Sequence, residues 1–110
     1  MKINGVNRKF RLTIGAVADI SAICPDGDID RMGELFDSPE INTILTATAK
    51  IAVAMNKYTD LSVDPLTVDE VFAMDMDQFK LLQEELLAAY KIDSIPKVNV
   101  RSKKKAEPKQ

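Results

Sequence analysis

The sequence predicts a mainly α fold with a short N-terminal β-hairpin, an α+β domain of about four to five helices. Two observations lead to this fold class. Apolar residues recur at steps of three and four over most of the chain, and an Asn-Gly pair stands at positions 4 and 5. A chain of 110 residues with 45% hydrophobic and 29% charged side chains has the composition of one globular domain.

The hairpin is predicted over Met1 to Thr13. Asn4-Gly5 is the favoured pair for a type I′ turn, in which both central residues need positive φ, and it would place Ile3 opposite Val6. Beyond the turn, apolar and polar residues alternate with the period of a half-buried strand. Val6, Phe10 and Leu12 would share the apolar face, which Arg8 interrupts.

Two helices are expected next. Thr13 can cap the first, which would run to about Ile23 and end before Pro25. A second, short helix would begin near Asp28. Its predicted apolar side consists of Ile29, Met32, Leu35 and Phe36.

The third helix is the most clearly marked. Ser38 would be its N-cap, Pro39 its first residue, and Glu40 would lie near the positive end of the helix dipole. Small residues between the apolar positions would let neighbouring helices approach on several sides, so we expect this helix to be central. Its predicted apolar stripe is Ile41, Ile44, Leu45, Thr48, Ile51, Ala52, Met55 and Tyr58.

Two further helices follow a loop that reaches Leu66. Thr67 and Glu70 have the spacing of a capping box and predict a short helix to about Met74. Asp75 is expected to begin the last long helix, which would end at Ser94, Ile95 and Pro96. The predicted apolar stripe of that helix is Phe79, Leu82, Leu86, Ala89 and Tyr90.

The composition changes at Lys97. Residues 97–110 carry six basic and one acidic side chain, a net charge of +5, whereas residues 1–96 carry nine basic and sixteen acidic ones, a net charge of −7. With almost no large apolar residue, the C-terminal segment cannot bury enough surface to fold. The sequence therefore predicts a single helical domain over 1–96 and a basic, disordered tail over 97–110.

Several kinds of chemistry find no support in the residues. Histidine is absent, which removes the commonest general base and metal ligand, and Cys24 has no histidine to activate it. Asp26, Asp28 and Asp30 have the initial spacing of a calcium loop, but Arg31 occupies the position that requires glycine. We therefore expect no enzymatic activity, no cofactor and no metal, and we interpret these aspartates as turn and capping residues.

Location and class of partner are also constrained. The N-terminal residues lack the apolar stretch of a signal peptide, and the apolar run over 41–49 is too short to cross a membrane. We expect a cytoplasmic protein that binds no membrane. An acidic body would repel nucleic acid, and no aromatic residue accompanies the basic tail, so nucleic-acid binding is the least favoured interpretation. The tail is interpreted first as a solubilising segment and next as one that docks onto a protein partner.

The residues predicted to contact such a partner lie between the third and the last helix. Methionine is adaptable enough to accept several apolar shapes, and aromatic side chains add contact area. The free edges of the hairpin also make self-association, and thus a homo-oligomer, an expectation. The predicted contact residues are Met55, Tyr58, Phe72, Met74 and Met76.

Three short motifs resemble the tail assembly chaperones of long-tailed bacteriophages. Ile3-Asn4-Gly5 stands where that family has an "ING" hairpin, and Thr13-Ile14-Gly15-Ala16 resembles its "TFGA" helix start, with isoleucine for the aromatic residue. Leu66-Thr67-Val68-Asp69-Glu70-Val71 is similar to its later helix opening. The resemblance extends over about the first 90 residues.

The resemblance implies a protein that binds the tape-measure protein, keeps it soluble and helps recruit the tail-tube protein. Such a chaperone would act in the host cytoplasm and would not be retained in the mature virion. Two alternatives remain: a structural phage component, such as a head–tail connector or minor tail protein, and a small DNA-binding regulator. The regulator would need a basic recognition helix, and the predicted long helices carry few basic residues.

Overall fold

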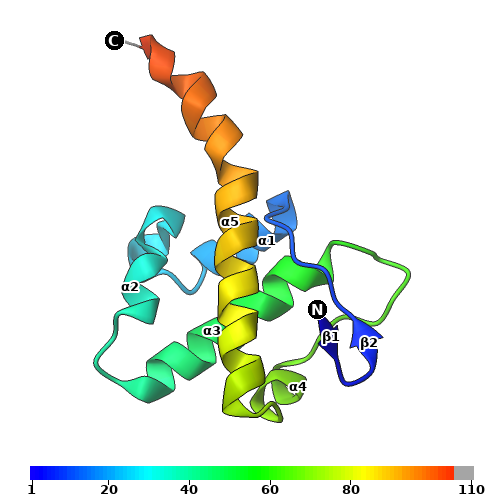
Figure 1. Ribbon diagram of the computed structural model, residues 1–110. Helices are drawn as coiled ribbons and strands as arrows, with labels where there is room; N and C mark the ends of the chain where they lie inside the picture. Colours follow the sequence, from blue (N-terminus) through cyan, green and yellow to red (C-terminus); the bar gives the residue numbers. More distant parts are fainter. Residues whose placement is uncertain (106–110) are drawn as a thin grey trace.

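The computed structural model describes the backbone of residues 1–105 and the side chains of residues 1–92. Within this part of the chain it is mainly helical, with five α-helices, two 3₁₀ turns and one two-stranded antiparallel hairpin. Figure 1 shows the shorter elements gathered around α3 and the first half of α5, while the second half of α5 leaves the body. The predicted fold class is confirmed.

The hairpin consists of β1 (Lys2–Ile3) and β2 (Val6–Asn7). Asn4 and Gly5 have φ of 53° and 81°, as a type I′ turn requires, and Ile3 pairs with Val6. The prediction of a longer strand is wrong, because residues 8–13 lie outside the hairpin ladder. Val6 is exposed although its partner Ile3 is buried, so it does not share the buried face of Phe10 and Leu12 as predicted.

The alternating pattern nevertheless persists in the extended segment that follows β2. Phe10 and Leu12 are buried in the core, and Lys9 and Arg11 face outward. Arg8 shares the buried side, with only 5% of its surface exposed, instead of interrupting it. Its guanidinium is held by polar groups of distant segments, and burial of a charge requires such partners.

Helix α1 (Ile14–Ser21) begins as predicted, because the Thr13 hydroxyl accepts a hydrogen bond from the amide of Ala16 at 3.1 Å. The predicted second helix is divided. A 3₁₀ turn at Pro25–Gly27 is followed by another at Ile29–Arg31 and by the single-turn helix α2 (Gly33–Phe36). Asp28 caps the second turn by accepting from the amide of Asp30 at 3.0 Å.

Helix α3 (Ile41–Lys57) starts later than predicted, with Glu40 and not Ser38 as its N-cap. The Ser38 hydroxyl instead accepts a hydrogen bond from the amide of Glu40 at 3.2 Å, so the residues before the helix form a local turn. The helix is central, as expected, and contacts α1, α2, α4 and α5. Small residues permit this close packing, and Ala47, Ala49, Ala52 and Ala54 are all buried.

Helices α4 (Val68–Phe72) and α5 (Met76–Lys105) complete the described chain. The helical backbone of α5 continues beyond the end predicted at Pro96; one proline removes a single backbone donor, and the turns on either side continue. Residues 106–110 lie outside the described chain, as do all side chains from 93 onward. The disorder predicted for 97–110 therefore stays a prediction.

Candidate functional site

The structure separates the five predicted contact residues into two groups. Met55 has none of its surface exposed and lies in the core, so a partner cannot contact it in this conformation. Tyr58 is half-buried, packs against Gly15 and donates a hydrogen bond to Asp19 Oδ2 at 3.3 Å. The sequence pattern placed Met55 and Tyr58 on the apolar stripe of α3. In the structure α1 packs against that part of α3, so Met55 is not open to a partner and Tyr58 is partly covered.

Phe72, Met74 and Met76 come together where α4 passes into α5. The exposed fractions of Phe72 and Met76 are 53% and 59%, large values for apolar side chains. With neighbouring residues they line an open cleft of about 300 Å³ between α3, α4 and α5. This cleft, called the α4 cleft below, is lined by Asn42, Leu45, Val71, Phe72, Met74, Met76 and Phe79.

Two helix caps position the exposed side chains of the α4 cleft. In the capping box of α4, the Glu70 amide donates to Thr67 Oγ1 at 3.2 Å and the Thr67 amide donates to Glu70 Oε1 at 3.0 Å. Three residues after the end of α4, Asp75 Oδ1 accepts a hydrogen bond from the amide of Gln78 at 2.8 Å and so caps the start of α5. The link between the two helices is therefore short and held at both ends.

The capping box is also connected to the buried guanidinium. Arg8 Nη2 lies 3.8 Å from Glu70 Oε1, and the side-chain Nδ2 of Asn4 donates to Glu70 Oε2 at 3.4 Å. The Thr67 backbone hydrogen bond, above all, lowers the pKa of Glu70, and Asn4 and Arg8 act in the same direction. Glu70 is thus held ionised at the base of α4, beside the α4 cleft.

The chemistry available in the α4 cleft is that of contact. Its lining is apolar except for the Asn42 amide, so it can bury methyl and aromatic groups but supplies no nucleophile, acid or base. Exposed carboxylates at Asp69, Asp75 and Asp77 lie next to it in the sequence. An apolar cleft bordered by acidic residues favours a segment that is apolar on one side and basic at its margins.

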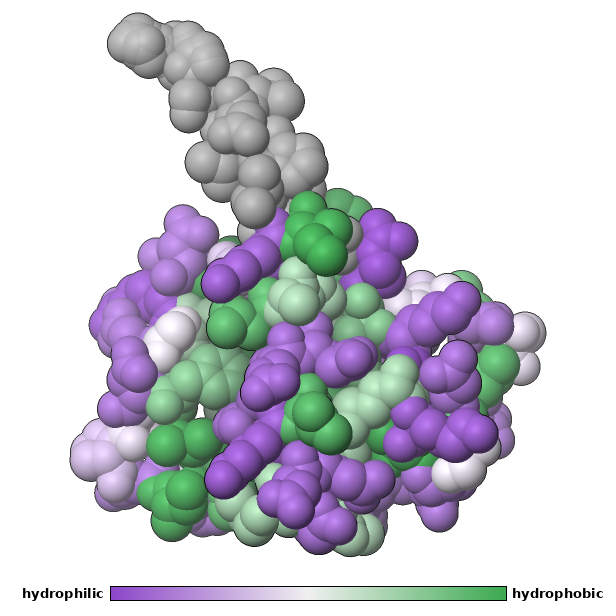
Figure 2. All heavy atoms as spheres, in the orientation of Figure 1, coloured by the Kyte–Doolittle hydropathy of each residue, from purple (hydrophilic) through white to green (hydrophobic). Residues whose placement is uncertain are grey.

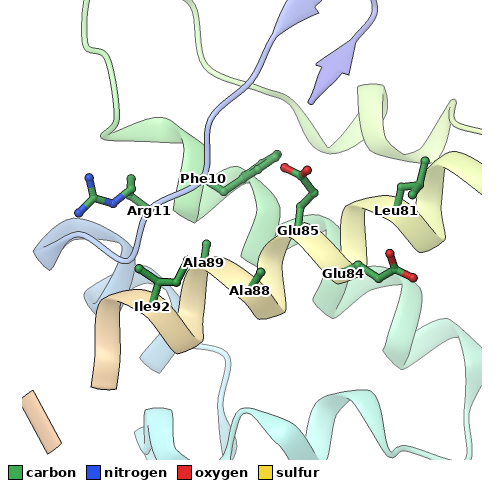
Figure 3. Close-up of a pocket in the computed structure, with 8 residues that line it drawn as sticks. All are labelled: Phe10, Arg11, Leu81, Glu84, Glu85, Ala88, Ala89 and Ile92. Atoms are coloured by element: carbon green, nitrogen blue, oxygen red, sulfur yellow. The ribbon is translucent and has the colours of Figure 1, made fainter. Parts of the chain in front are cut away.

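A second hollow lies along α5, and sequence reasoning missed it. This open hollow of about 590 Å³, called the α5 groove below, is lined by Phe10, Arg11, Leu81, Glu84, Glu85, Ala88, Ala89 and Ile92. In Figure 3 the extended segment carrying Phe10 and Arg11 runs beside α5, and Glu85 and the two alanines lie on the adjacent stretch of the helix. Figure 2 shows hydrophobic patches on either side of a hydrophilic strip along α5.

The sequence did contain a signal for the α5 groove. Leu81, Ala88 and Ile92 recur at steps of seven and four, which places them on one face of a helix beside the buried stripe. Leu81 and Ile92 are 55% and 70% exposed. The predicted stripe of α5 faces the core, and this second stripe stays exposed.

The remaining candidate residues do not form a site. Asp26 pairs with Arg31, which also contacts Glu34, while Asp28 caps the adjacent turn. Cys24 is buried, and desolvation, with a smaller effect of Asp28, raises the pKa of its thiol. Among residues whose side chains are described, no three histidine, cysteine or carboxylate groups are arranged to hold a metal ion.

Comparison with protein-family models, with characterised proteins and with solved structures finds no significant match to this chain. Over the described residues, no helix combines the length and the apolar character needed to cross a bilayer.

Proposed function

We propose that this protein is a tail assembly chaperone of a long-tailed bacteriophage or prophage. It binds the tape-measure protein in the host cytoplasm, keeps it soluble and helps recruit the tail-tube protein, and it is absent from the finished virion. The observation that carries the proposal is the α4 cleft, in which Phe72 and Met76 remain more than half exposed at a corner held by two helix caps.

The local structure of the motifs supports this proposal. Asn4-Gly5 forms the tight turn, and Thr13 caps α1. A side chain at Gly15 would meet the Tyr58 ring, so the glycine of the second motif is required by packing. Thr67 and Glu70 form the capping box that begins α4. These six motif residues therefore each have a structural reason to occupy their positions, whereas Ile14, at the aromatic position of the second motif, is 82% exposed.

The proposed client fits the chemistry of the α4 cleft. A long helical rod such as a tape-measure protein exposes apolar stripes before it is enclosed by the tail tube. Methionine side chains adapt to varied apolar shapes, and Phe72 supplies the larger contact area. A chaperone needs such a surface to bind many similar turns of a helix, and it needs no catalytic group.

The test is co-expression of the untagged chain with the tape-measure protein encoded near it, followed by affinity purification of the client. We expect the chain to co-purify and to increase the soluble fraction of the client. Phe72→Asp combined with Met76→Asp should weaken co-purification by at least about tenfold, since burial of two large apolar side chains is worth more than 1.4 kcal/mol.

Leu61→Asp combined with Val63→Asp is the matched control. Both residues are exposed, at 82% and 45%, on the loop between α3 and α4, so the same two changes there should leave client binding intact. Equal binding by the double variant and the parent would contradict the role of the α4 cleft. Detection of the chain in purified virions by mass spectrometry would contradict the chaperone function and favour a structural component of the particle.

A further inference from the structure

The α5 groove combines apolar and acidic surface. Leu81 and Ile92 stand toward its two ends with Ala88 between them, and Glu84 and Glu85 project from the same stretch of α5 (Figure 3). The Glu85 carboxylate is half exposed and lies 3.9 Å from the N-terminal ammonium of Met1. Arg11 lines the end of the groove near Ile92.

The chain itself contains a segment of complementary character. Residues 97–110 have a net charge of +5, against −7 for residues 1–96, and two valines, Val98 and Val100, stand among the first basic residues. Such a segment can satisfy carboxylates with its lysines and place small apolar groups on Leu81 and Ile92. Attraction between two regions of opposite charge also steers their encounter.

In the described helix, residues 97–105 cannot reach the groove of the same molecule. These residues and the groove lie on one helix, α5, whose backbone is continuous from Met76 to Lys105. At a rise of about 1.5 Å per residue, Arg101 lies about 24 Å along the axis from Glu85. Figure 1 shows this part of α5 directed away from the body. The basic segment is therefore presented to other molecules.

We propose that residues 97–105 of one copy dock in the α5 groove of a second copy. One molecule contributes its basic segment and the other its groove, so the contact is heterologous. Because each molecule then still has one free groove and one free segment, such contacts can extend into chains or close into rings. This inference concerns contacts between copies of the chain and stands independently of the proposed client.

The first experiment measures the mass of the untagged full-length protein by light scattering during gel filtration. We expect assemblies at about 0.05 M salt and monomers at about 0.5 M, because counterions screen contacts of this kind. Glu84→Lys with Glu85→Lys should abolish assembly. Asp37→Lys with Asp64→Lys makes the same change in net charge at exposed positions outside the groove and should leave assembly in place.

A mixing experiment identifies the occupant. The groove variant with Glu84→Lys and Glu85→Lys keeps the basic segment, and a tail variant with Lys103→Glu, Lys104→Glu and Lys105→Glu keeps the groove. Each alone should be monomeric, and their mixture should give a one-to-one heterodimer that grows no further. Monomeric parent protein at low salt, or a mixture that stays monomeric, would overturn the proposal and leave the groove to a basic helix of another protein.

A direct binding measurement covers the case in which a variant folds poorly. A fluorescent peptide with the sequence of residues 97–110 is titrated with the tail variant, whose groove is unaltered. We expect saturable binding that weakens at least tenfold at the higher salt concentration and is absent for the groove variant. Binding that is equal for the two variants would refute a specific contact at Glu84 and Glu85.

Discussion

At the residue scale, Arg8 connects parts of the chain that are far apart in sequence. Its Nη1 donates to the carbonyl oxygen of Asp64 at 2.6 Å and lies 3.5 Å from Asn56 Oδ1. Asn56 in turn donates to the carbonyl of Lys9 at 3.1 Å and accepts from the amide of Leu66 at 2.9 Å. The hairpin segment, the end of α3 and the following loop thus share one buried polar network.

Replacing Arg8 tests the contribution of this network. Arg8→Ala should lower the free energy of unfolding by about 2–4 kcal/mol, because the Asp64 carbonyl loses its donor, Glu70 loses its nearby cation, and the apolar stem leaves a void. Urea denaturation provides the measurement. Lys9→Ala, at the exposed neighbouring position, should change the free energy of unfolding by no more than about 0.5 kcal/mol. Equal effects of the two substitutions would show that the buried network does not contribute to the stability of the fold.

At the scale of elements, the approach of α1 to α3 depends on a missing side chain. A Cβ atom at Gly15 would lie 2.5 Å from Tyr58 Cε2, well inside van der Waals contact. The Tyr58 ring fills this space, and its hydroxyl donates to Asp19 on the next turns of α1. Lys57 adds to the same contact, with its Nζ 5.3 Å from the ring centroid.

Gly15→Ala should therefore lower the free energy of unfolding by about 1–3 kcal/mol, since the Tyr58 ring must move away from Asp19. Gly33→Ala is the control, because open space surrounds Gly33 in α2, and it should be neutral or stabilising by up to about 1 kcal/mol. Thermal denaturation of the two variants and the parent compares their stabilities. In a Tyr58→Ala background the cost of Gly15→Ala should disappear, and a cost that remained would locate the strain elsewhere.

At the scale of the whole molecule, one core connects all the helices. A single cluster of buried residues includes Ile3 from the hairpin, Ile20 from α1, Met55 from α3 and Leu82 from α5. Tyr90 packs against this core near the middle of α5, and Tyr58 packs against Gly15 of α1. A shared core predicts that both parts unfold together.

The two tyrosines allow this to be measured, because the chain has no tryptophan. Tyr58→Phe leaves Tyr90 as the fluorescent residue, and Tyr90→Phe leaves Tyr58. Within each variant, we expect the urea midpoint from tyrosine fluorescence to coincide with the midpoint from far-ultraviolet circular dichroism. Midpoints that differ within either variant would mean that α5 and the α1–α3 pair unfold separately.

Local chemistry made much of the fold predictable. The Asn4-Gly5 turn and the caps at Thr13, Thr67 and Asp75 depend on residues within three positions of one another, and all are present. Ser38 shows the limit of such reasoning. Its hydroxyl can begin a helix or close a turn, and nearby sequence does not distinguish the two outcomes.

The candidate surfaces were predictable only in part. Phe72, Met74 and Met76 were predicted from residue type and lie together, whereas Met55 is buried because α3 has neighbours on several sides. The α5 groove was missed because its second wall comes from Phe10 and Arg11, about 70 positions earlier in the chain.

By itself, then, the sequence determined the helical class, the hairpin turn, most helix starts and the opposite charges of the body and the C-terminal segment. These properties follow from interactions within one turn of backbone or from composition. The tertiary structure decided that Arg8 is buried, that a side chain at Gly15 would meet the Tyr58 ring, and that Phe10 and Arg11 form the second wall of the α5 groove. Each of these depends on side chains brought together from distant positions, and spacing along the chain does not encode which of them meet.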